Sequence, residues 1–141
     1  MLPFIYFWIL VMTVSASSNN FNSTEIPEII LLDQKGEEHH GSIGSRCWGL
    51  CVDYGMPSKR SDLGDRLVIQ GNETISFITR GHSEPERFLV TIFSGDNIIL
   101  NTNVEYNIKL DLQKGRYFLN IMAQWSGEGD VSYVFQIEIY K

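Results

Sequence analysis

The sequence has few cysteines and lacks the common catalytic motifs. Two cysteines among 141 residues are too few for a scaffold built on disulfides. There is no Gly-x-Ser-x-Gly nucleophile motif, no phosphate-binding glycine loop and no Asp-x-Asp-x-Asp-Gly calcium loop. We therefore predict a protein that is not an enzyme and needs no cofactor. Its core must come from side-chain packing, for which 43% of the residues are apolar.

Positive charge is also scarce. Eleven Lys and Arg stand against 17 Asp and Glu, which gives a net charge of −6 at pH 7. Nucleic acids and anionic membranes are bound by basic surfaces. The composition therefore argues against nucleic acid and against a membrane surface as partners, and it selects no other partner.

The N-terminal segment has no charged side chain at all. Residues 1–16 form an apolar run that ends in Val14-Ser15-Ala16 and is followed by serines, which is the pattern of a secretory signal cleaved after Ala16. The run is shorter than the roughly 20 residues of a membrane helix. Because no Lys or Arg precedes it, an uncleaved anchor is the alternative and the one predicted route to membrane contact. We predict a signal peptide at 1–16 and a flexible polar tether at 17–25.

The remainder of the chain shows no convincing helical periodicity. Apolar residues instead occupy every second position in residues 104–112, 117–125 and 131–139, which is the period of a β-strand with one buried face. Shorter apolar runs, separated by glycine- and asparagine-containing turns, precede them. We predict an all-β domain over residues 26–141, a Greek-key sandwich of about seven to nine antiparallel strands.

One local motif favours the Greek-key arrangement. Leu112, Gly115 and Tyr117 form Leu-x-x-Gly-x-Tyr at the entrance to a long alternating run. A tyrosine at this corner of a sandwich donates its hydroxyl hydrogen to backbone a few residues upstream. The alternative is a core tyrosine at the start of a strand, and both roles are structural.

A family resemblance follows from this motif and three further segments. They are Gly44-Ser45-Arg46-Cys47-Trp48, Ala123-Gln124-Trp125 and Tyr133-Val134-Phe135. Together they resemble small exported immunoglobulin-like domains of Gram-positive bacteria, over most of the chain that follows the signal segment. The resemblance implies an immunoglobulin-like fold and an extracellular or envelope location, and it implies no particular activity.

Residues 49–65 are irregular and contain three glycines and a proline, so we expect a long loop. Cys47 and Cys51 stand at its start, and neighbouring cysteines in an exported protein pair by default as a disulfide. The alternative is a thiol or metal protein that uses these two cysteines, with histidines as further ligands. Their spacing is one residue longer than the Cys-x-x-Cys redox motif.

Three residues of this region are candidates for binding. Trp48 and Tyr54 offer aromatic surface, and Asp53 offers a carboxylate beside them. The alternative for Trp48 is that it closes one end of the sandwich. Trp125 lies in phase with core positions and should be buried.

These observations predict an exported, non-catalytic binding domain that is secreted or attached to the cell envelope. The expected surface is the loop of residues 47–65, backed by residues 127–130, and the partner is an unidentified protein or envelope component. The alternatives are a protease-inhibitor-like domain that presents Pro57, a thiol or metal protein, and a structural envelope coat.

Overall fold

The computed structural model describes residues 25–141, so the predicted signal peptide and nearly all of the tether lie outside it. The described chain forms eleven strands and one short 3-10 helix. No helix among these residues has the length and apolarity to cross a membrane. The elements are β1 (Glu28–Leu32), β2 (Glu38–His40), β3 (Ser42–Trp48), β4 (Leu50–Asp53), η1 (Pro57–Lys59), β5 (Arg66–Ile69), β6 (Thr74–Arg80), β7 (Arg87–Ser94), β8 (Asn97–Val104), β9 (Asn107–Lys109), β10 (Gly115–Trp125) and β11 (Gly129–Ile139).

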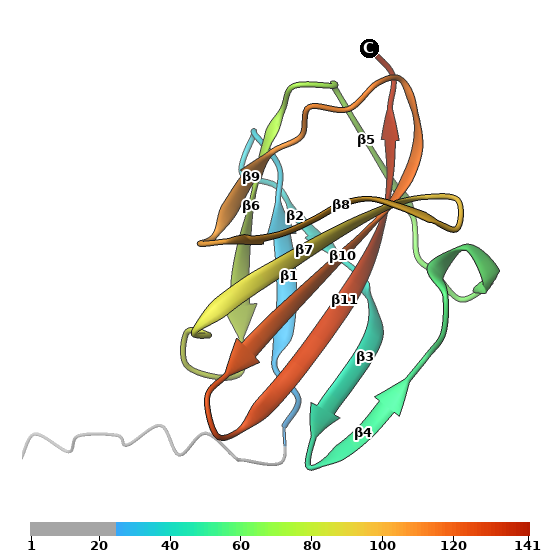
Figure 1. Ribbon diagram of the computed structural model, residues 1–141. Helices are drawn as coiled ribbons and strands as arrows, with labels where there is room; N and C mark the ends of the chain where they lie inside the picture. Colours follow the sequence, from blue (N-terminus) through green and yellow to red (C-terminus); the bar gives the residue numbers. More distant parts are fainter. Residues whose placement is uncertain (1–24) are drawn as a thin grey trace, which may run out of the picture.

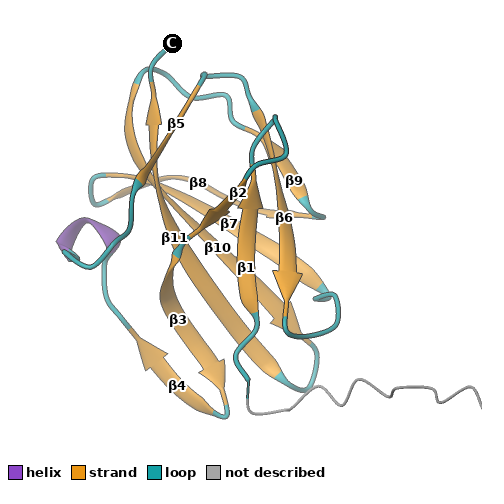
Figure 2. Ribbon diagram, turned by 180° about the vertical axis from the view of Figure 1, so that it is seen from behind, coloured by secondary structure: helices purple, strands orange, loops and turns teal. Residues whose placement is uncertain are grey.

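The strands form two sheets, one behind the other (Figures 1 and 2). The smaller sheet has the order β2-β1-β6-β9, and the larger has the order β4-β3-β11-β10-β7-β8. β5 joins the larger sheet by pairing in parallel with the C-terminal part of β11, whose N-terminal part pairs with β3. The other pairings among the described strands are antiparallel. This confirms an all-β chain with two antiparallel sheets, with more strands than expected.

The core lies between the two sheets, because both contribute the alternate side chains that face inward. Ile29, Leu31 and Ile75 come from the smaller sheet, and Leu119 and Ile121 come from β10 of the larger one; all five are fully buried. Trp125 is buried too, as its phase in the sequence predicts. Burial of such side chains is the main favourable term in folding.

The predicted strand at residues 104–112 is wrong. β8 ends at Val104, and only Asn107–Lys109 forms the short strand β9. The chain leaves the larger sheet after β8 and enters the smaller one, where β9 pairs with β6. Tyr106 lies in this crossing and is exposed, although it fits the period-two pattern. The alternation therefore runs across two strands that belong to different sheets.

The predicted loop at residues 49–65 is wrong at its start. Leu50–Asp53 forms β4, which pairs with β3 around a turn at Gly49. Gly49 has φ +75°, a conformation that glycine adopts without a steric cost. The irregular segment therefore begins at Tyr54.

The Tyr117 motif has the contact expected of a sandwich corner. The Tyr117 hydroxyl donates a hydrogen bond to the carbonyl of Gln113 at 2.8 Å. Gly115 has φ +156° where β10 begins, and Leu112 and Tyr117 both pack against the core cluster. The bond ties the start of β10 to the preceding connection.

Close approach of β11 to β3 generates a stability prediction. A Cβ atom on Gly129, where φ is +148°, would overlap the carbonyl oxygen of Cys47. We expect Gly129→Ala to lower the free energy of unfolding by about 2 kcal/mol or more, since both backbone and space oppose the methyl group. Gly64→Ala is the matched control, because nothing lies within 4 Å of its Cβ position. Urea unfolding of both variants measures this, and equal stabilities would contradict it.

Tyr133 generates a prediction about alkaline pH. Its hydroxyl donates to the carbonyl of Pro27 at 3.0 Å, and burial, with a smaller contribution from Glu28, raises the pKa of Tyr133 from 10.0 to about 12. The unfolded chain therefore loses this proton at lower pH than the folded chain. The resulting stability is complete below pH 10 and is lost as pH rises towards about 12.

Urea unfolding as a function of pH checks this. The difference in unfolding free energy between the wild type and Tyr133→Phe should be constant up to about pH 9 and shrink between pH 10 and 12. The other tyrosines and the lysines titrate in both proteins and cancel in the difference. A difference that stays constant throughout would show that the pKa of Tyr133 is not raised.

Candidate functional site

The outer face of the larger sheet is the broadest surface built by regular structure. Because Leu119 and Ile121 of β10 point into the core, the residues between them point outward. The pairing registers then define rows that cross the sheet. One row joins Val134, Asn120, Thr91 and Asn101 of four adjacent strands.

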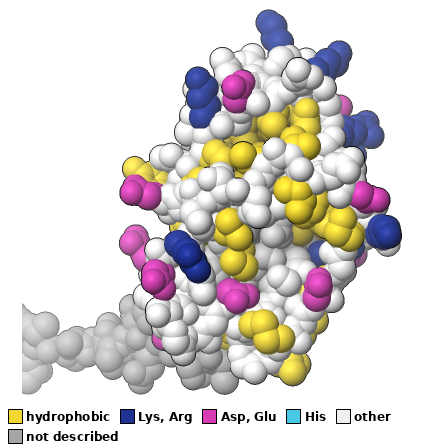
Figure 3. All heavy atoms as spheres, in the orientation of Figure 1, with side chains coloured by type: hydrophobic (Ala, Val, Ile, Leu, Met, Phe, Trp, Pro, Cys, Tyr) yellow, Lys and Arg dark blue, Asp and Glu magenta, His cyan; other side chains and the backbone are white. Residues whose placement is uncertain are grey.

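No charged side chain occurs in the middle rows on β7, β8, β10 and β11. On the edge strands, Asp53 of β4 and Arg66 of β5 stand at the ends of two of these rows. We call the surface of the middle rows the uncharged face, and it consists of Ser45, Leu89, Thr91, Phe93, Ile98, Asn101, Asn103, Phe118, Asn120, Met122, Ser132 and Val134. Charged residues stand in the rows beyond it: Arg87 and Asp130 at one end, Arg116 and Glu138 at the other. In the space-filling view, hydrophobic and uncharged groups occupy the middle and most charged side chains lie towards the margin (Figure 3).

The segment after β4 folds over one side of this face. Pro57 of η1 is buried, and the Ser58 hydroxyl donates to the carboxylate of Asp96 in the β7–β8 turn. A groove of about 350 Å³ lies between segment and sheet. It is lined by Gly44, Ser45, Asp53, Gly55, Met56, Pro57, Phe93, Asn120, Ser132 and Val134.

Arg60 holds the segment after β4 in place through hydrogen bonds of its side chain. Its guanidinium donates to the carbonyl of Ile43 at 2.6 Å and makes a two-point contact with Asp62, with N–O distances of 2.9 and 2.8 Å. The hydrogen bonds with Arg60 hold the pKa of the Asp62 carboxyl below its ordinary value. The same guanidinium lies 5.6 Å from the centre of the Tyr54 ring, within the range of cation–π attraction.

Trp48 is not an exposed recognition residue, and this part of the predicted site is corrected. Only 9% of Trp48 is exposed. Its ring meets Trp125 at 5.4 Å and His82 at 5.1 Å between centroids, both edge to face. The Trp125 indole donates to the carbonyl of Ser83 at 2.8 Å. This geometry favours the alternative in which Trp48 closes one end of the sandwich.

Asp53 and Tyr54, in contrast, lie at the edge of the groove. Asp53 lines it, and its carboxylate accepts a hydrogen bond from the backbone of Gly55 at 2.9 Å. Tyr54 is 43% exposed, and its backbone donates to the carbonyl of Gly44 at 3.1 Å. These two of the three predicted binding residues are therefore beside the uncharged face.

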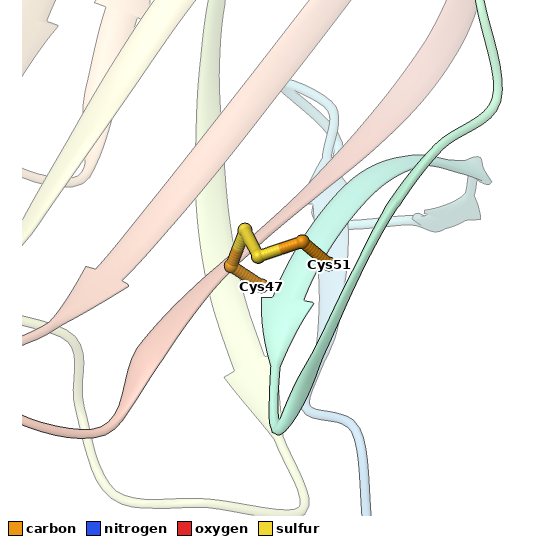
Figure 4. Close-up of a disulfide and its surroundings, with 2 residues drawn as sticks. All are labelled: Cys47 and Cys51. Atoms are coloured by element: carbon orange, nitrogen blue, oxygen red, sulfur yellow. A yellow bond between two sulfur atoms is a disulfide. The ribbon is translucent and has the colours of Figure 1, made fainter.

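The predicted disulfide is confirmed. Cys47 and Cys51 are bonded and stand directly opposite each other on β3 and β4 (Figure 4). Asp130 of β11 pairs with Cys47 on the other side of β3. The disulfide-bonded hairpin and residues 127–130 therefore lie at the same end of the sheet. The sequence predicted that these two segments would be neighbours.

One side-chain cluster has the residue types of a metal site. Ligand atoms of Asp33, Glu37 and His39 lie within 4.8 Å of one another. Asp33 already accepts hydrogen bonds from the backbone of Lys35 and Glu37, and it contacts the imidazole of His39 at 2.8 Å. The hydrogen bond with His39 is the main cause that lowers the pKa of Asp33. These contacts explain why the three side chains lie together: they stabilise the turn that joins β1 to β2.

Another apolar recess is at the open side of the sandwich, beside the crossing from β8 to β9. It has a volume of about 400 Å³. Phe77 and Phe88 form its floor with ring centres 5.6 Å apart, and Glu84, Glu105 and Tyr106 stand around it. Because both phenylalanines are core residues, the recess reflects the shortness of β9 and is a weaker candidate than the uncharged face.

Comparison of the chain with protein-family models, with curated proteins and with solved structures found no match. The resemblance to exported immunoglobulin-like domains of Gram-positive bacteria therefore stays a prediction. The candidate site stands on geometry alone.

The disulfide generates a prediction about stability. It closes a loop with a sequence separation of only four residues, and a loop this small restricts the unfolded chain little. We expect Cys47→Ser/Cys51→Ser to stay folded and to lose about 2 kcal/mol or less of unfolding free energy. Urea unfolding and circular dichroism measure this, with the wild type in reducing buffer as a comparison. An unfolded double variant would show that the hairpin depends on the bond.

Proposed function

We propose that this chain is an exported, non-catalytic binding domain that recognises a protein partner outside the cell or at its envelope. The recognition surface is formed by the exposed and partly exposed residues of the uncharged face, since its members Thr91, Ser132 and Val134 are buried. The groove beside Asp53 and Tyr54 lies at its margin. One observation carries the proposal: on β7, β8, β10 and β11 the middle rows of the outer face are free of charge, and charged residues stand in the rows beyond them and on the edge strands β4 and β5.

This pattern is that of a protein interface. The centres of protein–protein interfaces are depleted of charged residues, whereas the rims are polar and accessible. Removing a charge from water is costly unless it is paired, so a face without charges can be covered at little cost. Partly exposed Phe93, Phe118 and Met122 supply apolar area, and Asn101 and Asn103 supply amide donors and acceptors.

The protease-inhibitor alternative receives less support. An inhibitory loop must project into a cleft, whereas Pro57 is buried against the sheet and Arg60 and Ser58 fasten the segment around it. For the thiol alternative, both sulfur atoms are engaged with each other. Binding through the sheet face therefore fits the geometry better than either.

We propose further that the fold is of the immunoglobulin-like Greek-key type. Four features support this: β6 pairs with β9 in one sheet, β7, β10 and β11 are neighbours in the other, β5 runs parallel beside β11, and Tyr117 bonds back to Gln113. In this reading β1 and β2 extend the smaller sheet, and β3 and β4 extend the larger one. Secretion, with cleavage after Ala16, is part of the same proposal.

A matched pair of substitutions tests the recognition surface. Asn120→Lys places a charge in the middle of the uncharged face, and Asn107→Lys makes the same exchange on β9 of the smaller sheet. Wild type and variants are used as bait on the native extracellular and envelope fractions, and each enriched protein is then purified and titrated. We expect Asn120→Lys to weaken binding at least about tenfold, or about 1.4 kcal/mol, and Asn107→Lys to leave it unchanged.

Thermal unfolding of both variants controls for damage to the fold. If a folded Asn120→Lys protein binds every partner as tightly as the wild type, the uncharged face is not the recognition surface. If Asn107→Lys alone weakens binding, the smaller sheet is the surface instead.

A further inference from the structure

β8 is an edge strand of the larger sheet, and one of its sides is not paired with any described strand. It pairs with β7 along one side, and no strand in residues 25–141 pairs with its other side. Backbone N–H and C=O groups along that side therefore point away from the sheet. Such a row is a template for pairing with another strand, and natural proteins usually protect it.

The side chains of β8 offer no such protection. None of its eight residues is charged, and the nearest charged residues, Asp96 and Glu105, stand just beyond its two ends. Ile98, Ile99 and Leu100 are 59%, 47% and 36% exposed. Three consecutive apolar residues with this exposure on an open edge are an association surface rather than a solvated one.

The other free edges of the described sheets are short or charged. β4 has four residues, ends in Asp53 and is held by the disulfide. β2 and β9 have three residues each, with Glu38 on the first and Lys109 on the second. β5, which pairs only with β11, has four residues and begins with Arg66. Among the free edge strands of the described sheets, only β8 is long, uncharged and rich in exposed apolar side chains.

A bulge limits the regular part of this edge. The register shifts between Ile92, which pairs with Leu100, and Phe93, which pairs with Ile98, so Ile99 is the extra residue. Bulges twist a strand and interrupt its ladder. The regular ladder available to a second strand is therefore residues 100–104.

This segment is complementary to itself when it is reversed. In an antiparallel pair centred on Thr102, Leu100 stands opposite Val104 of a second copy, and Asn101 stands opposite Asn103. Leu100, Thr102 and Val104 lie on the core side of the sheet, opposite Ile92, Val90 and Phe88, and the asparagines lie on the outer side. Apolar side chains would meet apolar ones and amides would meet amides, which are favourable cross-strand pairs.

We propose that two copies of this chain associate through β8, edge to edge and antiparallel, so that their larger sheets become one continuous sheet. Two chains of net charge −6 repel each other, and β8 is an edge at which they can meet without opposing like charges. Adjacent antiparallel strands are related by a two-fold axis perpendicular to the sheet. Both uncharged faces therefore lie on the same side of the dimer, where they could bind a repeated partner with increased avidity.

Charge-pattern variants test the pairing. In Asn101→Lys/Asn103→Lys, lysines of the two copies stand opposite each other, and in Asn101→Glu/Asn103→Glu, glutamates do. We expect the full-length wild type to reach the mass of a dimer as concentration rises in sedimentation velocity. Each double variant should associate at least tenfold more weakly, and an equimolar mixture of the two should regain association at or near the wild-type level.

Leu50→Lys is the control, since it adds the same charge at the opposite edge of the sheet, where Leu50 is exposed; it should dimerise like the wild type. Circular dichroism confirms that each variant is folded. A wild type that stays monomeric at every soluble concentration would overturn the proposal, as would a folded double-lysine variant that dimerises normally or a mixture that stays monomeric. No partner is present in these measurements, so their outcome is separate from that of the proposed recognition function.

Discussion

The ladder between β10 and β11 determines where the other strands of the larger sheet lie. It runs without interruption from Gly115 and Ile139 to Trp125 and Gly129. β7 pairs with the free side of β10, and β3 and β5 share the free side of β11. Because side chains alternate along both strands, the same ladder supplies the core on one side and the middle of the uncharged face on the other. The core and the candidate site are therefore the two opposite faces of the same pair of strands, β10 and β11.

This coupling makes the uncharged face rigid. The outward residues Asn120 and Val134 are adjacent in sequence to inward residues that are fully buried, such as Leu119, or nearly so, such as Phe135, so their backbone has little freedom. At one end Trp48, His82 and Trp125 pack their rings together and join three connections. A surface held in this way loses little conformational entropy on binding, which favours affinity without a deep cleft.

Local sequence pattern predicted those parts of the fold that depend on a single strand. Alternation located β10 and β11 because their inward side is buried along the whole length. It failed at residues 104–112, since a period of two continues through a crossing from one sheet to the other. The sequence could not show whether Trp48 would face the solvent or close one end of the sandwich, because its size alone does not decide its side of the hairpin. The uncharged face could not be located either, because Thr91, Asn120 and Val134 become neighbours only when the strand order is known.

The edge strands β4 and β8 of the larger sheet differ in a way that limits its growth. At one edge β4 is short, ends in an acidic residue and is covalently closed onto β3, so it offers little ladder to another strand. At the other edge β8 is long and neutral. A contact between unlike edges would repeat and form filaments, whereas a contact between like edges consumes the open edge of both copies and closes. The described strands therefore favour association that stops at a symmetric pair and leaves the uncharged faces accessible.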